Sequence, residues 1–588
     1  MTVAAAFTLA VVLIVVLLLI SDRFPADLVM FGGLAALMVS GVVAPHHALS
    51  GFSNPATATI AVLLLVAEAA RETGALRLIA GLLQGRDDGP RGTMLRVAVP
   101  TAGLSAFLNN TPIVAMLIPV VHDLARRTGQ APSRFLMPLS FAAILGGTCT
   151  LIGTSTNLVV AGLMDQASLA PLTMFELTWV GLPTALLGML YLATLGDRLL
   201  PRRRGPESSL DDSWREFVAE VVVQPSSPLI GRSVEEAGLR HLPGLFLVEI
   251  RRAAGEVLHP VSPTHVLLAD DVLALVGRAE TIGDLRALPG LQPREQTSLG
   301  DALRSDLYEV VISHHSRLVG VSVREAGFRG RYGAAVLAVH RAGSRIHQKI
   351  GDISLRPGDT LMLTASAGFG RTWRASRDFY LVSSVNGAPV PRYRHAPLAL
   401  TIIAGLVLLP TLTGAPMLLV ALGALLLLLV TRCLTSRGVQ RALDVPLLVV
   451  VASSLGISQA LQASGAADLL AEGLLAVNTT LGPFGALAAT YLATALLTAL
   501  VTNAAAAALI FPVAMVAAEA AGLPMRPYAI AIALAASAAF ATPIAYQTNM
   551  MVQGPGGYRF TDFVKVGLPL NALCMAVAMI VIPWRWGL

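Results

Sequence analysis

Two short polar motifs interrupt apolar stretches of the chain, and each of them has a second copy. The segment SAFLNNTPIVAMLIPV contains Asn110, and TALVTNAAAAALIFPV contains Asn503, with a proline nine residues later in both copies. Asn and Thr cap helix N-termini, and proline is tolerated in the first turn of a helix. The pattern therefore predicts a helix, a turn and a new helix, whose free N–H groups and positive dipole end would suit an anion.

The second motif follows the first at almost the same distance in each half. Asn157 ends the segment GGTCTLIGTSTN, 47 residues after the first asparagine, and Asn549 ends TPIAYQTN, 46 residues after the second. Glycines in one copy and Pro543 in the other should unwind a helix midway. The carbonyl groups that unwinding frees would suit a cation such as Na+.

The order of these motifs favours a duplicated site over isolated packing features. Ser and Thr in membrane helices commonly bond back to a carbonyl or join neighbouring helices, which is the simpler interpretation of one motif alone. Here Val-Gly-Leu-Pro also closes both halves, at Pro183 and Pro569, and 72–83 resembles 463–475. Four ordered anchors predict an internal repeat whose two copies meet near the midplane of a membrane.

The composition indicates the elements that must position these motifs, namely membrane helices. The chain of 588 residues is 55% hydrophobic and 13% charged, about half the charged fraction of a soluble domain. A spanning helix needs about 20 apolar residues. Segments that meet or approach this length lie at 4–20, 27–43, 57–70, 180–199, 397–411, 415–431, 445–462, 484–500 and 567–584. The segment 94–123 is expected to be a re-entrant hairpin. Glu68 is a candidate functional group if it lies inside the membrane, but the neighbouring charges favour a place near a helix end.

The distribution of charge predicts the orientation of these helices. Basic residues cluster at 202–204, 392–394 and 432–441, which places these ends on the cytoplasmic side. The net charge of +6 is then a signal of topology, and no nucleic-acid partner is expected. The first apolar segment lacks a basic start and a cleavage site, so we expect a spanning helix there. The three cysteines lie in apolar segments and form no disulfide or metal-binding pattern.

Between the two membrane halves lies a polar insert that is itself duplicated. LIGRSVEEAGLR is repeated as LVGVSVREAGFR, and LLADDVLAL, with Asp271, as LRPGDTLML, with Asp359. These motifs resemble the TrkA-C domain of regulators of K+ conductance, present at 208–295 and 300–370. The resemblance implies α+β modules that dimerise. A small ligand on the insert and a purely structural or dimerising role both stay open.

The membrane halves, 1–200 and 395–588, resemble the divalent-anion/sodium symporter family, within a superfamily that also holds arsenite pumps and Na+/H+ antiporters. That family carries Ser-Asn-Thr at each hairpin tip, where this chain has Asn109-Asn110-Thr111 and Thr502-Asn503-Ala504. The resemblance implies an inverted repeat with re-entrant hairpins and broken helices. It also implies a homodimer that works by an elevator-type alternating-access mechanism.

The same resemblance implies which residues form the site. Those that would contact the substrate are Asn109, Asn110, Thr111, Thr156, Asn157, Thr502, Asn503, Thr548 and Asn549. One Na+ site would use Ser105, Asn110 and Gly153, and the other Thr498, Asn503, Ala541 and Pro543. Ala504 lacks the hydroxyl of the family motif, which weakens a dicarboxylate assignment. The insert and the segment GPGGYRF resemble a branch of the family associated with sulfate.

These observations predict a secondary transporter in the inner (plasma) membrane, in contact with lipid and with its insert in the cytoplasm. We expect Na+-coupled symport of a small divalent anion, with sulfate favoured and a dicarboxylate next. An Na+/H+ antiporter would need a titratable group at the midplane, and the four motifs contain no Asp or Glu. A ligand-gated channel is suggested by the insert, but no Thr-Val-Gly-Tyr-Gly filter occurs. Enzymatic nucleotide, zinc-protease and hydrolase motifs are absent from the sequence.

Overall fold

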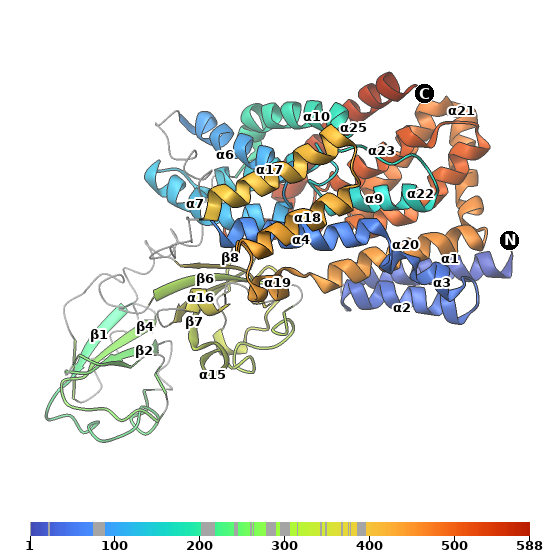
Figure 1. Cartoon of the computed structure of the whole chain (residues 1–588). Helices are drawn as coiled ribbons and strands as arrows, with labels where there is room; N and C mark the ends of the chain where they lie inside the picture. The colour runs from blue at the N-terminus through green and yellow to red at the C-terminus, as the bar shows by residue number, and fades with distance from the viewer. Residues whose placement is uncertain are drawn as a thin grey trace. The chain divides into compact units, whose positions relative to one another are not determined.

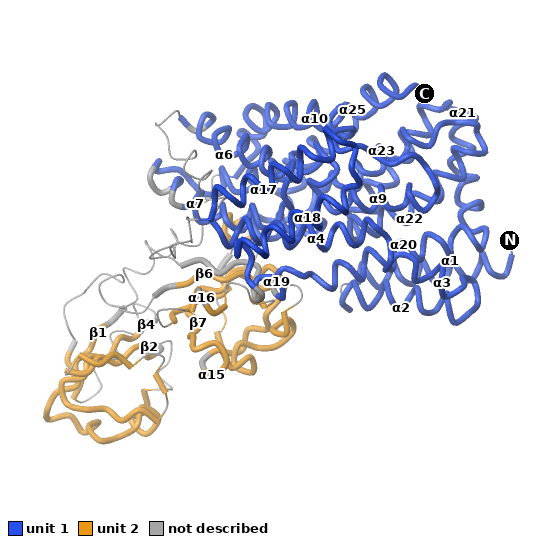
Figure 2. Tube along the Cα trace, viewed as in Figure 1, with its two compact units in different colours: residues 1–202, 391–552, 558–588 blue, residues 203–390, 553–557 orange. Residues whose placement is uncertain are grey.

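The computed structural model divides the chain into two compact units, which are described separately (Figure 2). One comprises 1–202, 391–552 and 558–588, and the other comprises 203–390 with 553–557. The structure describes the chain apart from residues 1, 22–23, 75–88, 202–217, 240–244, 254, 259–260, 263, 278–289, 294–305, 314–315, 342–343, 347, 349, 366–368, 374–375, 377 and 385–394.

The first unit is helical, and many of its helices are long and apolar (Figure 1). Among the described residues, eight helices are long and apolar enough to cross a membrane. They are α1 (Val3–Ser21), the stretch Pro45–Glu72 that ends in α4 (Pro55–Glu72), Thr178–Leu199 with α10 (Thr178–Tyr191), α17 (Ala396–Thr413), α20 (Val445–Ala463), α21 (Ala466–Thr498), α22 (Asn503–Ala520) and α25 (Phe560–Trp586).

This unit also contains the shorter apolar helices α2 (Ala26–Val39), α7 (Asn110–Arg127) and α18 (Met417–Val430). Large apolar side chains point outward from several helices. Leu426 on α18, for example, is 62% exposed. A surface of this kind is stable in lipid, because hydrocarbon chains solvate leucine as well as a protein core does. The prediction of a polytopic α-helical membrane protein is confirmed.

The helices end and restart at the polar motifs in both halves. In the first half, α6 (Gly89–Ser105) precedes α7, and α8 (Leu136–Gly147) precedes α9 (Ser155–Gln166). In the second half, α21 precedes α22, and α23 (Met525–Ser537) precedes α24 (Gln547–Gln553). Both members of the first helix pair pack on α8, and both members of the second pack on α23. The sequence repeat is therefore also a repeat of packing.

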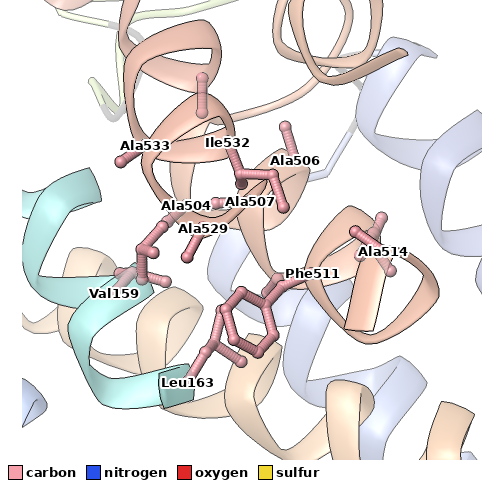
Figure 3. Close-up of a cluster of buried hydrophobic side chains, with 14 of the residues drawn as sticks. Val159, Leu163, Ala504, Ala506, Ala507, Phe511, Ala514, Ala529, Ile532 and Ala533 are labelled. Carbon is pink, nitrogen blue, oxygen red and sulfur yellow. The ribbon is translucent and has the colours of Figure 1, made fainter. Parts of the chain in front are cut away.

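Small side chains let the second pair approach its neighbours closely. α22 presents a run of alanines to α9 and α23, and the side chains that meet there are all buried (Figure 3). Phe511 of α22 and Leu163 of α9 fill the space beside this alanine surface (Figure 3). Small residues at helix interfaces in membranes bring backbones together and increase van der Waals contact. This packing fixes the start of α22, where Asn503 lies.

The insert contains two five-stranded antiparallel sheets. Their strand orders are the same when the second sheet is read from β8 to β10. The first, β3-β2-β4-β1-β5, comprises β1 (Val218–Val223), β2 (Leu245–Arg251), β3 (Val257–Leu258), β4 (Val272–Gly277) and β5 (Leu291–Pro293). The second, β10-β6-β9-β7-β8, comprises β6 (Asp306–Ile312), β7 (Ala334–Arg341), β8 (Ser344–Arg345), β9 (Thr360–Ala365) and β10 (Phe379–Ser384). Two short helices, α15 (Phe328–Tyr332) and α16 (Phe369–Trp373), accompany the second sheet.

The two aspartates aligned in the sequence hold equivalent places in the two sheets. Asp271 accepts a hydrogen bond from Arg252 at 2.6 Å, and Asp359 accepts from Arg341 at 2.7 and 2.8 Å. Each also accepts from the backbone N–H three residues before it. The hydrogen bond with Asp359 raises the pKa of the Arg341 guanidinium. The second sheet continues through β10, beyond the boundary at 370 that the sequence motifs suggested.

Candidate functional site

The first hairpin tip is organised around Asn110, the first residue of α7. Its side chain is fully buried. Ser105, the last residue of α6, donates its hydroxyl proton to Asn110 Oδ1, so the amide bridges the turn between the two helices. Asn110 Nδ2 donates to the hydroxyl of Tyr546 at 2.6 Å. Two of the predicted site residues, Ser105 and Asn110, therefore lie in direct contact.

The second tip repeats the bridge across the turn with Thr498 and Asn503. Thr498 Oγ1 lies 2.9 Å from Asn503 Oδ1 and also 2.9 Å from the carbonyl oxygen of Ala536. A hydroxyl has one proton, so it donates to one of these oxygens at a time. Asn503 is half-buried, and Thr502 is exposed and caps the backbone N–H of Ala505 at 3.4 Å. The two tips therefore share one design but differ in how deeply they are enclosed.

The interrupted helices are held by an asparagine in each half. Asn157 Nδ2 donates to the carbonyl oxygens of Gly147 at 3.2 Å and Thr150 at 2.8 Å. Asn549 Nδ2 donates to the carbonyl oxygens ten and seven residues before it, at 2.8 and 3.1 Å, which is the same pattern. Each amide thereby satisfies carbonyls that lost their helical partners. Asn157 and Asn549 were predicted to contact the substrate, but in each of them both Nδ2 protons are donated to backbone carbonyls of the chain itself.

Oxygen atoms converge beside the first tip because two glycines bring the backbones together. A Cβ on Gly153 would lie 2.5 Å from the carbonyl oxygen of Gly147 and 2.9 Å from that of Ser105. A Cβ on Gly147 would lie 2.9 Å from Asn110 Oδ1. Neutral oxygen ligands of this kind suit a hard cation such as Na+. Ser105, Asn110 and Gly153, predicted together from the sequence, therefore surround one place.

The second half has side chains where the first has these glycines. The repeat positions of Gly147 and Gly153 are Ala539 and Ala545. Ala541 and Pro543, predicted for the second Na+ site, lie in the irregular segment between α23 and α24. When the two halves are aligned at Asn157 and Asn549, Gly153 corresponds to Ala545 and not to Ala541 or Pro543.

The second interrupted helix contacts the first hairpin tip across the two halves. Besides its bond with Asn110, the Tyr546 hydroxyl lies 3.3 Å from Thr154 Oγ1, and Thr111 donates to Gln547 Oε1 at 3.1 Å. Thr154, Tyr546 and Gln547 are not among the site residues predicted from the sequence. A signal was present, because tyrosine and glutamine are uncommon in an apolar segment and directly precede the predicted Thr548 and Asn549.

The other predicted residues lie around these contacts. Ser140 Oγ lies 2.9 Å from Thr548 Oγ1 and 2.7 Å from Asn549 Oδ1, and its one proton is donated to one of them at a time. Thr156 is buried in α9. Asn109 lines a cavity of about 20 Å³ with Ser155 and apolar residues of α4, a volume for roughly one water molecule.

One ion pair of the first unit lies at the C-terminal end of α4. Glu68 and Arg71, one turn apart on α4, form an ion pair at 2.5 Å, which agrees with the helix-end role expected for Glu68. Among the residues that the structure describes, no group of three or more His, Cys, Asp or Glu side chains could hold a metal ion. The polar groups at the hairpin tips are amides, hydroxyls, carbonyls and helix ends.

Similarity to known proteins identifies the family of this chain. The model of the citrate transporter family CitMHS matches residues 16–523 and 489–587. A putative sulfur deprivation response regulator of Chlamydomonas reinhardtii is 37% identical over 95% of this chain and 97% of its own length. The uncharacterized transporter YfbS of Escherichia coli is 30% identical over 98% of both chains.

A further relative carries a more specific description. Sodium/sulfate cotransporter 1 of Chlamydomonas reinhardtii is 26% identical, over 92% of this chain and 85% of its own. The matching family is one of transporters and not of enzymes, as the sequence predicted. The chain therefore belongs to the citrate transporter (CitMHS) family and is a secondary transporter.

Proposed function

We propose that the chain is a Na+-coupled symporter of a small divalent anion, with sulfate the first candidate and a dicarboxylate the next. The observation that carries the proposal is the repeated pair of a hydroxyl and an asparagine at a helix N-terminus, Ser105 with Asn110 and Thr498 with Asn503. Relatives described as sodium/sulfate cotransporters support the choice of ions. Sodium would be a cosubstrate and not a cofactor.

The proposed chemistry divides the work between helix ends and unwound backbone. The starts of α7 and α22 offer free N–H groups, a positive dipole end and the side chains of Asn109, Thr111 and Thr502 to the anion. The carbonyls of Ser105 and Gly147, with Asn110 Oδ1, would hold Na+ in the first half. Placing Na+ beside the anion would offset its charge in a site that has no cationic side chain in the four motifs.

Citrate is a second candidate substrate, because the matching family model is described as a citrate transporter. Ala504 argues against citrate and dicarboxylates, because the second tip lacks the hydroxyl that Thr111 provides in the first and that would bind a carboxylate group. An Na+/H+ antiporter is less well supported, because it would need a carboxylate that binds the proton and the four motifs contain none.

We further propose that the halves form an inverted repeat with re-entrant hairpins, which moves by an elevator mechanism within a homodimer. Thr154 and Tyr546 hold the same position in the two repeats and contact each other, as residues beside a pseudo-twofold axis would. The protein would lie in the inner (plasma) membrane. Its insert, with two TrkA-C-like domains, would be cytoplasmic and would dimerise or regulate. Deleting 208–385 should change assembly or regulation, and a change in anion preference would contradict this role.

Uptake of radiolabelled sulfate into proteoliposomes tests the transport proposal. We expect uptake that requires an inward Na+ gradient and is reduced by excess unlabelled sulfate. Unlabelled citrate and an unlabelled dicarboxylate serve as competitors. If either one inhibits the uptake of labelled sulfate more strongly than unlabelled sulfate does, that anion becomes the proposed substrate. Equal uptake with and without the Na+ gradient would contradict Na+ coupling.

A further inference from the structure

Tyr546 and Gln547 bind the first hairpin tip at the side chains that the proposed anion would need. Asn110 Nδ2 donates to the Tyr546 hydroxyl at 2.6 Å, and Thr111 Oγ1 donates to Gln547 Oε1 at 3.1 Å. Both contacts join residues 436 positions apart, from opposite halves of the membrane unit. The donors of this tip therefore have partners within the chain before any substrate arrives.

The geometry points to Tyr546 and Gln547 as placeholders for the anion, an inference that rests on the proposed function. We propose that the anion displaces these two side chains and accepts the hydrogen bonds of Asn110 and Thr111 in their place. A phenol and an amide are neutral acceptors, whereas sulfate and carboxylate oxygens are charged. Charge-assisted hydrogen bonds are roughly twice as strong as neutral ones, so an anion can win this exchange and a neutral solute cannot.

Burial explains why a placeholder is needed. Asn110 is fully buried, and a buried donor left without an acceptor is costly. Tyr546 removes that cost in the empty protein, but the anion must then break the same bond to bind. The placeholder therefore lowers the affinity for the anion while keeping the empty site intact.

The same displacement would connect the anion to the second half-site. Tyr546 ends the irregular segment 538–546, and Gln547 begins α24. The segment is held by Asn549, whose amide donates to the carbonyls of Ala539 and Thr542. Moving Tyr546 away from the first tip would shift these carbonyls. Anion and cation binding would then be coupled, and the coupling would be reciprocal.

Tyr546→Phe is the decisive variant, because it removes the acceptor and keeps the ring. Equilibrium binding of labelled sulfate to the purified full-length protein, in saturating Na+, should show a Kd about 3- to 10-fold lower than that of the wild type, the equivalent of roughly one hydrogen bond. Gln547→Leu should lower the Kd by a smaller factor, because Thr111 is only half-buried. Tyr191→Phe, which loses a 2.8 Å bond to the carbonyl of Val566 outside the motifs, is the matched control and should bind as the wild type does.

A raised Kd in Tyr546→Phe would overturn the proposal, because it would mean that the hydroxyl itself binds the anion. An unchanged Kd would overturn it as well. A second measurement tests the contact without any substrate. Thermal unfolding of Asn110→Ala, Tyr546→Phe and the double variant should show non-additive losses, since the two residues share one bond. Additive losses would refute the contact.

The two measurements separate the possible failures. If the wild type binds none of sulfate, a dicarboxylate and citrate, the proposed function fails and the placeholder role fails with it, although the unfolding cycle still reports the contact. If the wild type binds sulfate and Tyr546→Phe shows no gain, the function stands and the placeholder role alone is refuted.

Discussion

The two hairpin tips keep the same asparagine but place it in different surroundings. Asn110 is fully buried, beside Gly147 and Gly153, and it contacts the other half through Tyr546. Asn503 is half-buried, its bond with Thr498 lies within its own half, and alanines replace the two glycines. Both copies have the hydroxyl–asparagine bond that closes the turn and the asparagine that binds the carbonyls of the interrupted helix. Under the proposed function, the first tip would therefore contact a small bound ion more closely than the second.

Removing either asparagine should have the largest effect on transport. We expect Asn110→Ala and Asn503→Ala to reduce sulfate uptake to background, with the protein still inserted and folded. Asn110→Ala should also lower the unfolding temperature more, because it leaves the buried hydroxyl of Ser105 without its partner and removes one of the two contacts of the Tyr546 phenol. Asn478→Ala, on α21 outside the motifs, is the matched control. Uptake that persists in both site variants would refute the shared site.

The glycine at the first tip should be the next most sensitive position. Gly153→Ala places a Cβ 2.5 Å from a carbonyl oxygen, so the oxygens around the first cation site must move apart. We expect the Na+ concentration for half-maximal uptake to rise about 10- to 100-fold. Ala545→Gly, the reciprocal change, should alter it little. Equal effects of the two substitutions would remove the distinction between the tips.

The asparagines that hold the interrupted helices should affect stability more evenly. Asn157→Ala and Asn549→Ala each leave two carbonyls without a donor, at a cost of about 1–3 kcal/mol. Asn549→Ala should be the more destabilising, because it also removes the nearer of the two acceptors of the Ser140 hydroxyl. Thermal unfolding in detergent measures both losses. A larger loss for Asn157 would show that the first half depends more on its own bridge.

The smallest effect is expected when the second tip is made to resemble the first. Ala504→Thr adds the hydroxyl that Thr111 supplies in the first half, at a position that is 4% exposed. Crowding should cost about 1–3 kcal/mol of stability. If the family motif acts as its resemblance implies, inhibition of sulfate uptake by a dicarboxylate should increase by a small factor. The same variant with unchanged competition would show that the second tip does not select the anion.

Much of the fold follows from local sequence. Long apolar runs predicted the membrane helices, and the polar groups around Asn110 and Asn503 coincide with the ends of α6 and α21, since caps and glycines act over one or two turns. The aligned Asp271 and Asp359 also have equivalent places in the two sheets of the insert.

Contacts between distant residues could not be predicted in this way. The bond between Asn110 and Tyr546 depends on how two halves pack, and nothing local to either residue encodes it. The direction of the Asn157 and Asn549 amides was also missed, because an asparagine can face a substrate or its own backbone with the same sequence around it. In the insert, β10 joins its sheet from beyond the repeated motifs.

The contact of Thr154 with Tyr546 has a consequence for the history of the chain. Immediately after a gene duplication, two equivalent positions that touch each other carry identical residues, and every such contact is a residue meeting its own copy. Two threonines would leave space at that point, and two tyrosines would compete for it. A single substitution in one copy gives a large partner and a small one, which fit. Positions of this kind are where a duplicated transporter first stops being symmetric, and where its descendants should differ most from one another.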